Sequence, residues 1–281
     1  MRAIRPRSDS AALPDGAPGV TPSGTMGLMK PLLALWLGLF ALTMRADPES
    51  DVRQAVSELA RTSFAWETTV RQRFSGETTE LRVNLNAPLE ARGRVDPDGY
   101  AEVTLMPSRE LAAPLTAIFR QGEVVAHTPL GWLRRTEMRE TPGQDRLVDF
   151  GGKQVRLSRV FKVALEVTAR RRPTEDLLDL IAEIKSYRTT EGLVIAELRD
   201  QAVEKLWGAS EAKRAPEIQG TAIFKFSAAG LEACHLMIAI GFPNSATKKI
   251  AWSMQQWSTR FTGIGSTTVE PPAEAVKALA D

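Results

Sequence analysis

Few residues in this sequence could act as nucleophiles or bases. It contains two histidines, His127 and His235, and one cysteine, Cys234. Hydrolytic chemistry needs a nucleophile within hydrogen-bond reach of a base, and neither histidine lies in a recognisable nucleophile motif. Cys234 and His235 are consecutive in a segment patterned as a strand, so their side chains are expected on opposite faces. The sequence therefore predicts neither a Cys–His catalytic pair nor a zinc site.

Acidic residues gather on a predicted helix that begins at Pro173. Glu175, Asp176 and Asp179 lie on this helix. Paired carboxylates of a glycosidase work only across a cleft, whereas the opposite face of this helix is apolar. We therefore interpret the acidic residues as a solvated helix face. The sequence predicts no catalytic residue and no enzymatic activity.

A run of three arginines, Arg170 to Arg172, comes just before the same helix. Three adjacent positive charges could contact the headgroups of anionic lipids. A solvated loop that leads into a helix also explains such a run, and the sequence favours this interpretation.

The helix from Pro173 also carries an apolar stripe at helical spacing, which continues to Ile184. If this helix lies over a curved sheet, the stripe and an apolar strand face would enclose a cavity. An acyl chain in such a cavity gains ~0.8 kcal/mol per buried methylene. If the interior is filled, the same residues are simply core, and the sequence leaves both interpretations open. The candidate lining residues are Phe64, Trp66, Phe74, Leu81, Val83, Leu177, Leu178 and Ile181.

The elements that must position these residues are mostly strands. Apolar and polar residues alternate over 64–74 and again over 81–87, which is typical of an antiparallel sheet with one solvated face. The segment Asp96-Pro-Asp-Gly99 predicts a turn, because proline presets φ and glycine accepts a positive φ. Further strands are predicted at 100–106, 115–120, 123–127, 131–138, 187–199 (a hairpin that turns at Glu191-Gly192), 220–227, 231–242 and 248–262.

Helices interrupt or flank these strands. Beside the helix from Pro173, they are predicted at 51–62, 201–207 and 273–279, whereas residues 141–159 are weakly patterned. The strands at 231–242 and 248–262 are apolar on both faces, which indicates that both of their sides are covered. The predicted fold class is α+β: a large curved antiparallel β-sheet, a half-open barrel, with a few helices packed in its concave face.

Composition fits one globular domain over residues 47–281. Of the 281 residues, 43% are hydrophobic and 25% are charged, which are ordinary values. A formal net charge of +2 gives no basic surface for nucleic acid. A single cysteine excludes an intramolecular disulfide framework, so the core must hold the domain together. No cofactor is predicted.

Residues 26–46 have the layout of a secretory signal peptide. Lys30 precedes an apolar run from Pro31 to Thr43, and Arg45-Ala-Asp-Pro48 ends the run. The run is shorter than the ~20 residues that a membrane-crossing helix needs, and no cysteine follows it for a lipid anchor. The sequence therefore predicts export to the periplasm or out of the cell.

The preceding residues, 1–25, are rich in proline, glycine, serine and arginine and lack apolar periodicity. We expect them to be disordered or to precede the true start of translation at Met26 or Met29. Removal of the signal peptide would give a soluble product, whereas retention would leave an N-terminal anchor. Contact with a membrane is expected only through such an uncleaved segment or transiently.

Three stretches carry a resemblance to known proteins: Phe64-Ala-Trp66, Thr128-Pro-Leu-Gly-Trp132 and residues 261–275. They are similar to segments of uncharacterised exported proteins of Planctomycetes and Verrucomicrobia. The expected architecture resembles the lipoprotein-carrier (LolA-like) fold, which mycobacterial lipid-carrying lipoproteins share. The resemblance covers roughly residues 50–279 and carries over no catalytic residue. It implies a curved sheet with helices at its mouth and a role in holding acyl chains.

Two functions are consistent with this sequence. The first is an exported, soluble carrier or sensor that holds a lipid, a lipoprotein acyl chain or another amphiphile between the sheet and the helices. The second is a structural or interaction protein of the cell envelope, with a filled core and no small ligand. An apolar cavity would favour the first, and a packed interior with an exposed apolar patch the second. The oligomeric state does not follow from the sequence.

Overall fold

The computed structural model describes residues 47–75, 90–107, 113–170, 172–208, 215–243 and 250–280. The described part from Asp47 onward forms one compact unit. The predicted signal peptide and the predicted strand at 81–87, with the candidates Leu81 and Val83, lie outside the described residues.

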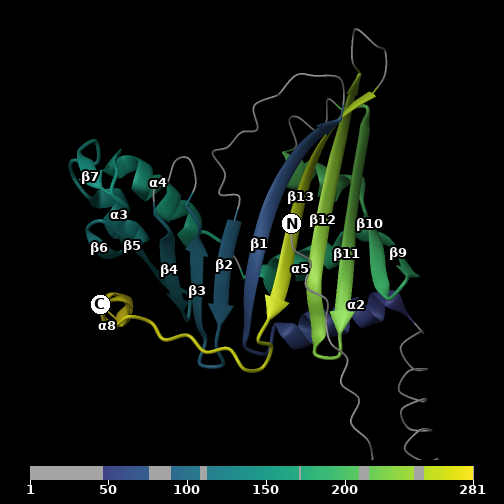
Figure 1. Cartoon of the computed structure of the whole chain (residues 1–281), viewed down its shortest axis with the longest axis horizontal. Coiled ribbons are helices and arrows are strands. Elements are labelled where there is room, and N and C mark those ends of the chain that lie inside the picture. The colour runs from purple at the N-terminus through teal and green to yellow at the C-terminus, as the bar shows by residue number, and fades with distance from the viewer. Residues whose placement is uncertain are drawn as a thin grey trace, which may run out of the picture. The chain divides into compact units, whose positions relative to one another are not determined.

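Within the described residues, eleven strands form one antiparallel sheet, and two short strands, β7 (Leu147–Asp149) and β8 (Gln154–Arg156), pair separately. The strands of the large sheet are β1 (Phe64–Ser75), β2 (Glu90–Val95), β3 (Tyr100–Leu105), β4 (Leu115–Arg120), β5 (Glu123–Thr128), β6 (Gly131–Arg134), β9 (Ile184–Thr190), β10 (Leu193–Leu198), β11 (Glu217–Ser227), β12 (Gly230–Pro243) and β13 (Ile250–Thr262). Their order is β6-β5-β4-β3-β2-β1-β13-β12-β11-β10-β9 (Figure 1). Pairing of β1 with β13 therefore joins an N-terminal and a C-terminal half into one sheet.

The two faces of this sheet differ, because consecutive residues of a strand point to opposite sides. In β1, Phe64 and Trp66 are buried, whereas Glu67 is exposed. The cross-strand partners of Trp66 are Gly93 in β2 and Phe261 in β13, so all three lie on one face. We call the face that carries Trp66 the inner face and the opposite one the outer face.

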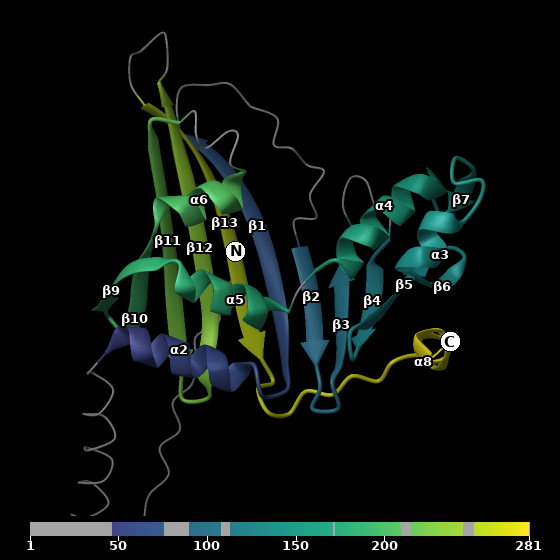
Figure 2. The same ribbon diagram turned by 180° about the vertical axis from the view of Figure 1, so that it is seen from behind.

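Helices cover most of the inner face. The helices of the described residues are α2 (Pro48–Leu59), α3 (Arg135–Glu140), α4 (Leu157–Thr168), α5 (Pro173–Ala182), α6 (Asp200–Trp207) and α8 (Ala273–Ala280). Figure 2 shows α2, α5 and α6 in front of the C-terminal half of the sheet, while α4 packs on β3, β4 and β5. Pro48 and Pro173 occupy first-turn positions in α2 and α5, where a missing N–H costs nothing.

The C-terminal helix α8 packs on the outer face of the N-terminal half. Ile118 in β4 and Val125 in β5 are buried there against Ala275 of α8. Their neighbours Ala117 and Ala126 point the other way, into the main core under α4. Strands β4 and β5 are therefore covered on both faces.

The predicted fold class is confirmed: the chain is an α+β protein built on a large, curved antiparallel sheet. The sheet is not closed into a barrel, since β6 and β9 form its two edges. The predicted turn between β2 and β3 is present. Gly99 has a φ of 85°, and the N–H of Tyr100 donates to Asp96 Oδ1 at 2.8 Å. The hairpin of β9 and β10 turns at Glu191 and Gly192, as predicted.

The helices α3 and α4 were not predicted. The segment at 131–138 is the short strand β6 followed by α3, so the prediction of one strand there is wrong. The weakly patterned residues 141–159 contain β7, β8 and the start of α4. Several residues of α4 are β-branched or aromatic and have low helix propensity. Packing outweighs this propensity, since Leu157, Val160, Phe161, Ala164 and Val167 share one buried side.

Candidate functional site

A cavity of about 460 Å³ lies between the inner face of the sheet and the helices α5 and α6. One wall comes from β1, β2, β3, β12 and β13, and the opposite wall comes from the two helices. Its volume falls within the range of ~300–1,000 Å³ that is usual for small-molecule pockets. The sequence allowed either a filled interior or a cavity between the sheet and the helices, and the structure has a cavity here.

The sheet wall of the cavity is largely apolar. Trp66, Leu236 and Trp257 line it, and the last two are direct cross-strand partners on β12 and β13. Two threonines in this wall, Thr68 and Thr259, bond to each other through their hydroxyl groups at 2.9 Å. This bond satisfies one of the two hydroxyl donors and so lowers the cost of covering these polar atoms with an apolar ligand.

Cys234 also lines the sheet wall and is buried. Burial raises the pKa of its thiol to about 12, because the thiolate would lose its hydration. The thiol is therefore protonated at neutral pH and presents a small apolar surface to the cavity.

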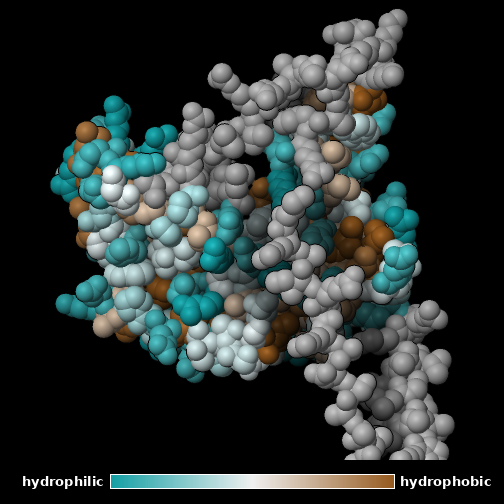
Figure 3. Space-filling view, in the orientation of Figure 1, coloured by the Kyte–Doolittle hydropathy of each residue, from teal (hydrophilic) through white to brown (hydrophobic). Residues whose placement is uncertain are grey.

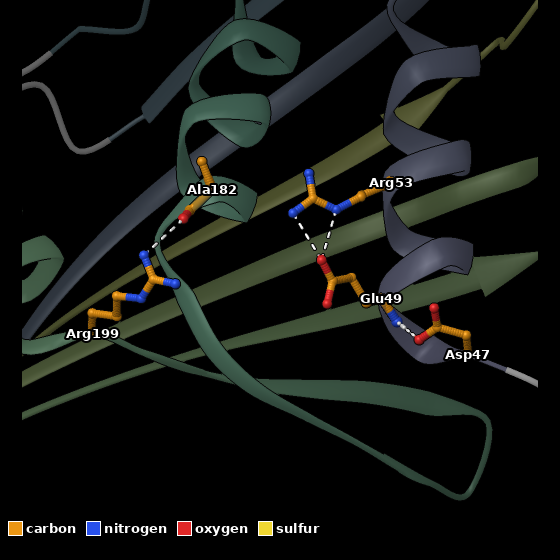
Figure 4. A network of polar contacts seen from close by, with 5 residues as sticks. All are labelled: Asp47, Glu49, Arg53, Ala182 and Arg199. Carbon is orange, nitrogen blue, oxygen red and sulfur yellow. Dashed lines mark hydrogen bonds and ion pairs between the residues drawn. The ribbon is translucent and has the colours of Figure 1, made fainter.

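The helix wall is formed by Leu177 and Leu180 of α5 and by Leu206 of α6. The C-terminal end of α5 is held by Arg199, whose Nη1 donates to the carbonyl of Ala182 at 3.5 Å (Figure 4). A guanidinium is favourable at this end of a helix, where carbonyl groups lack intrahelical partners.

Helix α2 lies against α5 and further fixes its position. The N–H of Glu49 donates to Asp47 Oδ1 at 3.1 Å, which caps the start of α2. Glu49 also pairs with Arg53 one turn later at 2.8 Å, and Figure 4 shows both contacts beside α5. Helix α5, which forms part of the cavity wall, is therefore supported by α2, and the first turn of α2 is capped by Asp47.

Charged side chains stand at the rim of the cavity. Asp176 and Asp179 come from α5, Glu183 follows this helix directly, and Lys205 comes from α6. The predicted solvated acidic face of α5 is confirmed, since Asp176 and Asp179 are exposed. Arg170 lines the rim just before α5. Partial burial lowers the pKa of its guanidinium, while the nearby carboxylates of Glu166 and Asp176 raise it, and an arginine keeps its charge under such influences.

The structure brings together some of the predicted lining residues and separates others. Trp66 and Leu177 line the cavity. Phe64 and Ile181 are 1% and 2% exposed and belong to the packed core beside it, where the ring centroid of Phe64 lies 5.7 Å from that of Trp66. Leu178 is 42% exposed and lies outside the cavity wall.

The position of Leu178 follows from helix geometry. The buried side of α5 holds Thr174, Leu177, Leu180 and Ile181, and Leu178 is turned by about 100° from Leu177 along the helix. The predicted apolar stripe continued to Ile184, but the helix ends at Ala182 and Ile184 is the first residue of strand β9.

One predicted lining residue, Phe74, lies in β1 opposite Ser253 of β13, and its side chain is not among those described. Sequence reasoning missed much of the actual wall, including Trp257, Val103, Ala91 and Leu206. The alternation in 231–242 does place Cys234 and Leu236 on one face, so a signal for part of the wall was present. No local pattern shows that β13 pairs with β1, which is what brings Trp257 to the cavity.

Within the described residues, the cysteine and the two histidines lie in different surroundings. Cys234 points to the inner face, whereas His235 Nδ1 lies 3.0 Å from Ser258 Oγ on the outer face. His127 packs on Trp132 with ring centroids 5.1 Å apart. Across the described ranges, no group of three His, Cys, Asp or Glu side chains is placed to hold a metal ion.

In the part of the chain that the structure describes, no helix has both the length and the apolar character that crossing a membrane requires.

Comparison with protein-family models and with curated proteins gives no match. Among solved structures, the chain is similar to one described as "Lipid-protein interactions in lipovitellin". The similarity has 8% sequence identity and a TM-score of 0.24, and it covers 76% of this chain and 26% of that chain. A likeness of this size identifies neither a family nor a function.

Proposed function

We propose that this protein binds a lipid or a lipoprotein acyl chain in the cavity between the sheet and the helices. It acts without chemistry on its ligand, as a soluble, exported binding or carrier protein. The observation that supports this most is the 460 Å³ cavity itself, with Trp66, Leu177, Leu236 and Trp257 in its walls. This is also the role that the resemblance to LolA-like carrier proteins implies.

The binding energy in this proposal comes from transfer of methylene groups out of water. Burial of twelve methylenes contributes roughly 10 kcal/mol, at ~0.8 kcal/mol each. Association costs at least ~4 kcal/mol in lost freedom. The balance of at most ~6 kcal/mol corresponds to a Kd of several tens of micromolar or weaker, which suits a carrier that must also release its ligand.

The exported location in this proposal depends on residues 26–46, whose pattern is that of a signal peptide. An exported carrier with one cysteine, buried and protonated, suits an oxidising compartment, because it presents no exposed thiol for unwanted disulfides.

A second candidate function is that of an envelope interaction protein that uses its outer face. Met237 on β12 is 42% exposed there, and Ile223 and Met254 on the flanking strands are partly exposed. Figure 3 shows hydrophobic residues gathered over this part of the sheet. In this alternative the cavity holds no ligand and the outer face meets a partner.

Substitutions at two adjacent residues of β12 distinguish the two candidate functions. Leu236 faces the cavity and Met237 faces outward. We expect the wild-type protein and Met237→Glu to enhance the fluorescence of N-phenyl-1-naphthylamine, with palmitate displacing the dye. Leu236→Glu should abolish this signal, and Leu236→Trp, which narrows the cavity without adding charge, should weaken it.

Thermal unfolding of each variant shows whether it is folded before its binding is compared. Loss of dye binding in Met237→Glu but not in the Leu236 variants would contradict the proposal. Absence of binding in the wild-type protein would also contradict it and would favour the interaction protein.

A further inference from the structure

A second, smaller cavity adjoins the first at its Arg170 end. It has a volume of about 240 Å³, and Val103 and Arg170 line both cavities. Its other walls come from β3, from the end of β4 with the turn that follows, and from the start of α5. The two hollows therefore offer an elongated ligand one large apolar compartment and one smaller compartment beside it.

Two arginines determine the character of the smaller compartment. Arg170 lies in the loop between α4 and α5, where its backbone N–H donates to the carbonyl of Val167 at 3.1 Å. Arg172 is the residue before α5, and its Nη2 donates to the carbonyl of Gly99 at 3.5 Å. Both residues line the cavity. The backbone of Arg170 and the side chain of Arg172 are therefore each held by a contact with a backbone carbonyl.

Other charged groups also surround this compartment. Arg120 also lines it, but its guanidinium lies over the ring of Tyr100 at 4.6 Å, on the outer side of the sheet. Glu175 lines the compartment, and Glu166 and Asp176 act electrostatically on Arg170. Glu175 and Asp176 each take part in a further interaction within the protein.

The opposite end of the larger cavity has a different charge. The lining residues there are Asp179 of α5, Glu183 just after this helix, and Lys205 of α6. An anionic group at this end would face two carboxylates and one lysine, whereas at the other end it would face Arg170 and Arg172, with Glu175 and Asp176 beside them. The charge distribution therefore favours one orientation for an amphiphile with an anionic end.

We infer that the ligand is a single-chain amphiphile with an anionic headgroup, a carboxylate or a phosphate. Arg170 and Arg172 hold the headgroup in the smaller compartment, and the chain lies along Trp66, Leu177 and Trp257 in the larger one. Guanidinium groups suit this role because their planar array of donors matches both oxyanions. This inference rests on the proposed function, which requires only an apolar chain in the cavity.

The test compares four ligands with the same sixteen-carbon chain: palmitate, hexadecyl phosphate, hexadecanol and hexadecylamine. We expect palmitate or hexadecyl phosphate to bind the wild-type protein about tenfold more tightly than hexadecanol, which is the effect of one charge-assisted hydrogen bond. The tighter of the two anions distinguishes a fatty acid from a lipid phosphate. Hexadecylamine should bind most weakly.

Arg170→Gln should remove the preference for the anion and leave hexadecanol binding within about twofold, a change below ~0.5 kcal/mol. Arg188→Gln, on the exposed edge strand β9, is the matched control and should retain the preference. A loss of packing alone would weaken all ligands together and leave their ratio unchanged.

The outcomes are distinct. If hexadecanol binds as tightly as the anions, or if hexadecylamine binds most tightly, the inference is wrong and the proposed function stands. If Arg170→Gln keeps the full preference for anions, the inference is wrong as well. If none of the four ligands binds, the proposed function itself fails.

Discussion

The indole ring of Trp66 in β1 lies directly over the backbone of Gly93 in β2. A Cβ atom built on Gly93 would lie 2.0 Å from Cζ2 of Trp66, far inside van der Waals contact. Gly93 is the cross-strand partner of Trp66, so the absence of a side chain leaves the space that the indole occupies. This pair fixes the position of the largest aromatic group in the β1 part of the cavity wall.

We predict that Gly93→Ala moves the Trp66 indole toward the cavity, since the sheet blocks movement the other way. Overpacking of this kind costs about 1–3 kcal/mol of unfolding free energy, and the displaced ring should also weaken palmitate binding. Urea unfolding and a binding titration measure the two effects. Gly192→Ala, in the open turn between β9 and β10, should affect stability through its backbone strain but leave binding intact. Unchanged binding in Gly93→Ala would contradict this account.

Leu177 and Leu178 provide a test of which side of α5 is buried. Leu177 is 7% exposed and Leu178 is 42% exposed. Leu177→Ala should lower the free energy of unfolding by about 2–4 kcal/mol, because it deletes buried methyl groups. Leu178→Ala should change it by less than ~0.5 kcal/mol. Urea denaturation of both variants checks this, and equal losses would show that the helix is packed differently.

Burial of the Cys234 thiol should make the free energy of unfolding fall as the pH rises above about 8. Its thiol has an ordinary pKa of 9.0, and burial raises this to about 12 in the folded protein. Between these values the unfolded chain loses its proton while the folded chain keeps it, so rising pH favours unfolding by about 1.4 kcal/mol per pH unit.

The cysteine contribution is obtained by comparing wild type with Cys234→Ala in urea. From pH 8 to pH 10, wild type should lose roughly 1 kcal/mol more than the variant. Below pH 8 the difference between the two should be constant. A difference that stays constant through pH 10 would mean that Cys234 is reached by water in the folded state.

The side chain of Arg134 helps to hold α8 on the outer face of the sheet. Its Nε and Nη2 donate to the carbonyls of Ala278 and Leu279 at 2.9 and 3.0 Å. Arg134→Ala should therefore speed amide hydrogen exchange in α8, and Arg134→Lys should restore protection only in part, since an ammonium lacks the paired geometry. Arg139→Ala, exposed on α3, is the control. Unaltered exchange in Arg134→Ala would show that apolar contacts alone hold α8.

The sequence made the antiparallel sheet predictable because its period-two pattern is local. Alternation over 64–74 assigns Phe64 and Trp66 to the buried face and Glu67 to the exposed one, as the structure has it. Turn residues such as Gly99 marked the ends of neighbouring strands. Each of these signals depends on residues that are close in the sequence.

Other features depend on contacts between distant residues and were not predictable. Trp257 reaches the cavity only because β13 pairs with β1, where Val70 and Trp257 are partners. Helix α4 forms against its local propensity because β3, β4 and β5 give its apolar side a surface to cover. Leu178 was misplaced for a simpler reason, since an apolar residue at the flank of a helix stripe can point either way.

The central claim is that the cavity holds a chain of methylene groups. Native mass spectrometry of the protein, purified without detergent and incubated with palmitate, tests it most directly. We predict a one-to-one adduct in wild type and in Met237→Glu, a weaker one in folded Leu236→Trp, and none in folded Leu236→Glu. Bare protein masses at every palmitate concentration, or an equal adduct in all of these proteins, would contradict the claim.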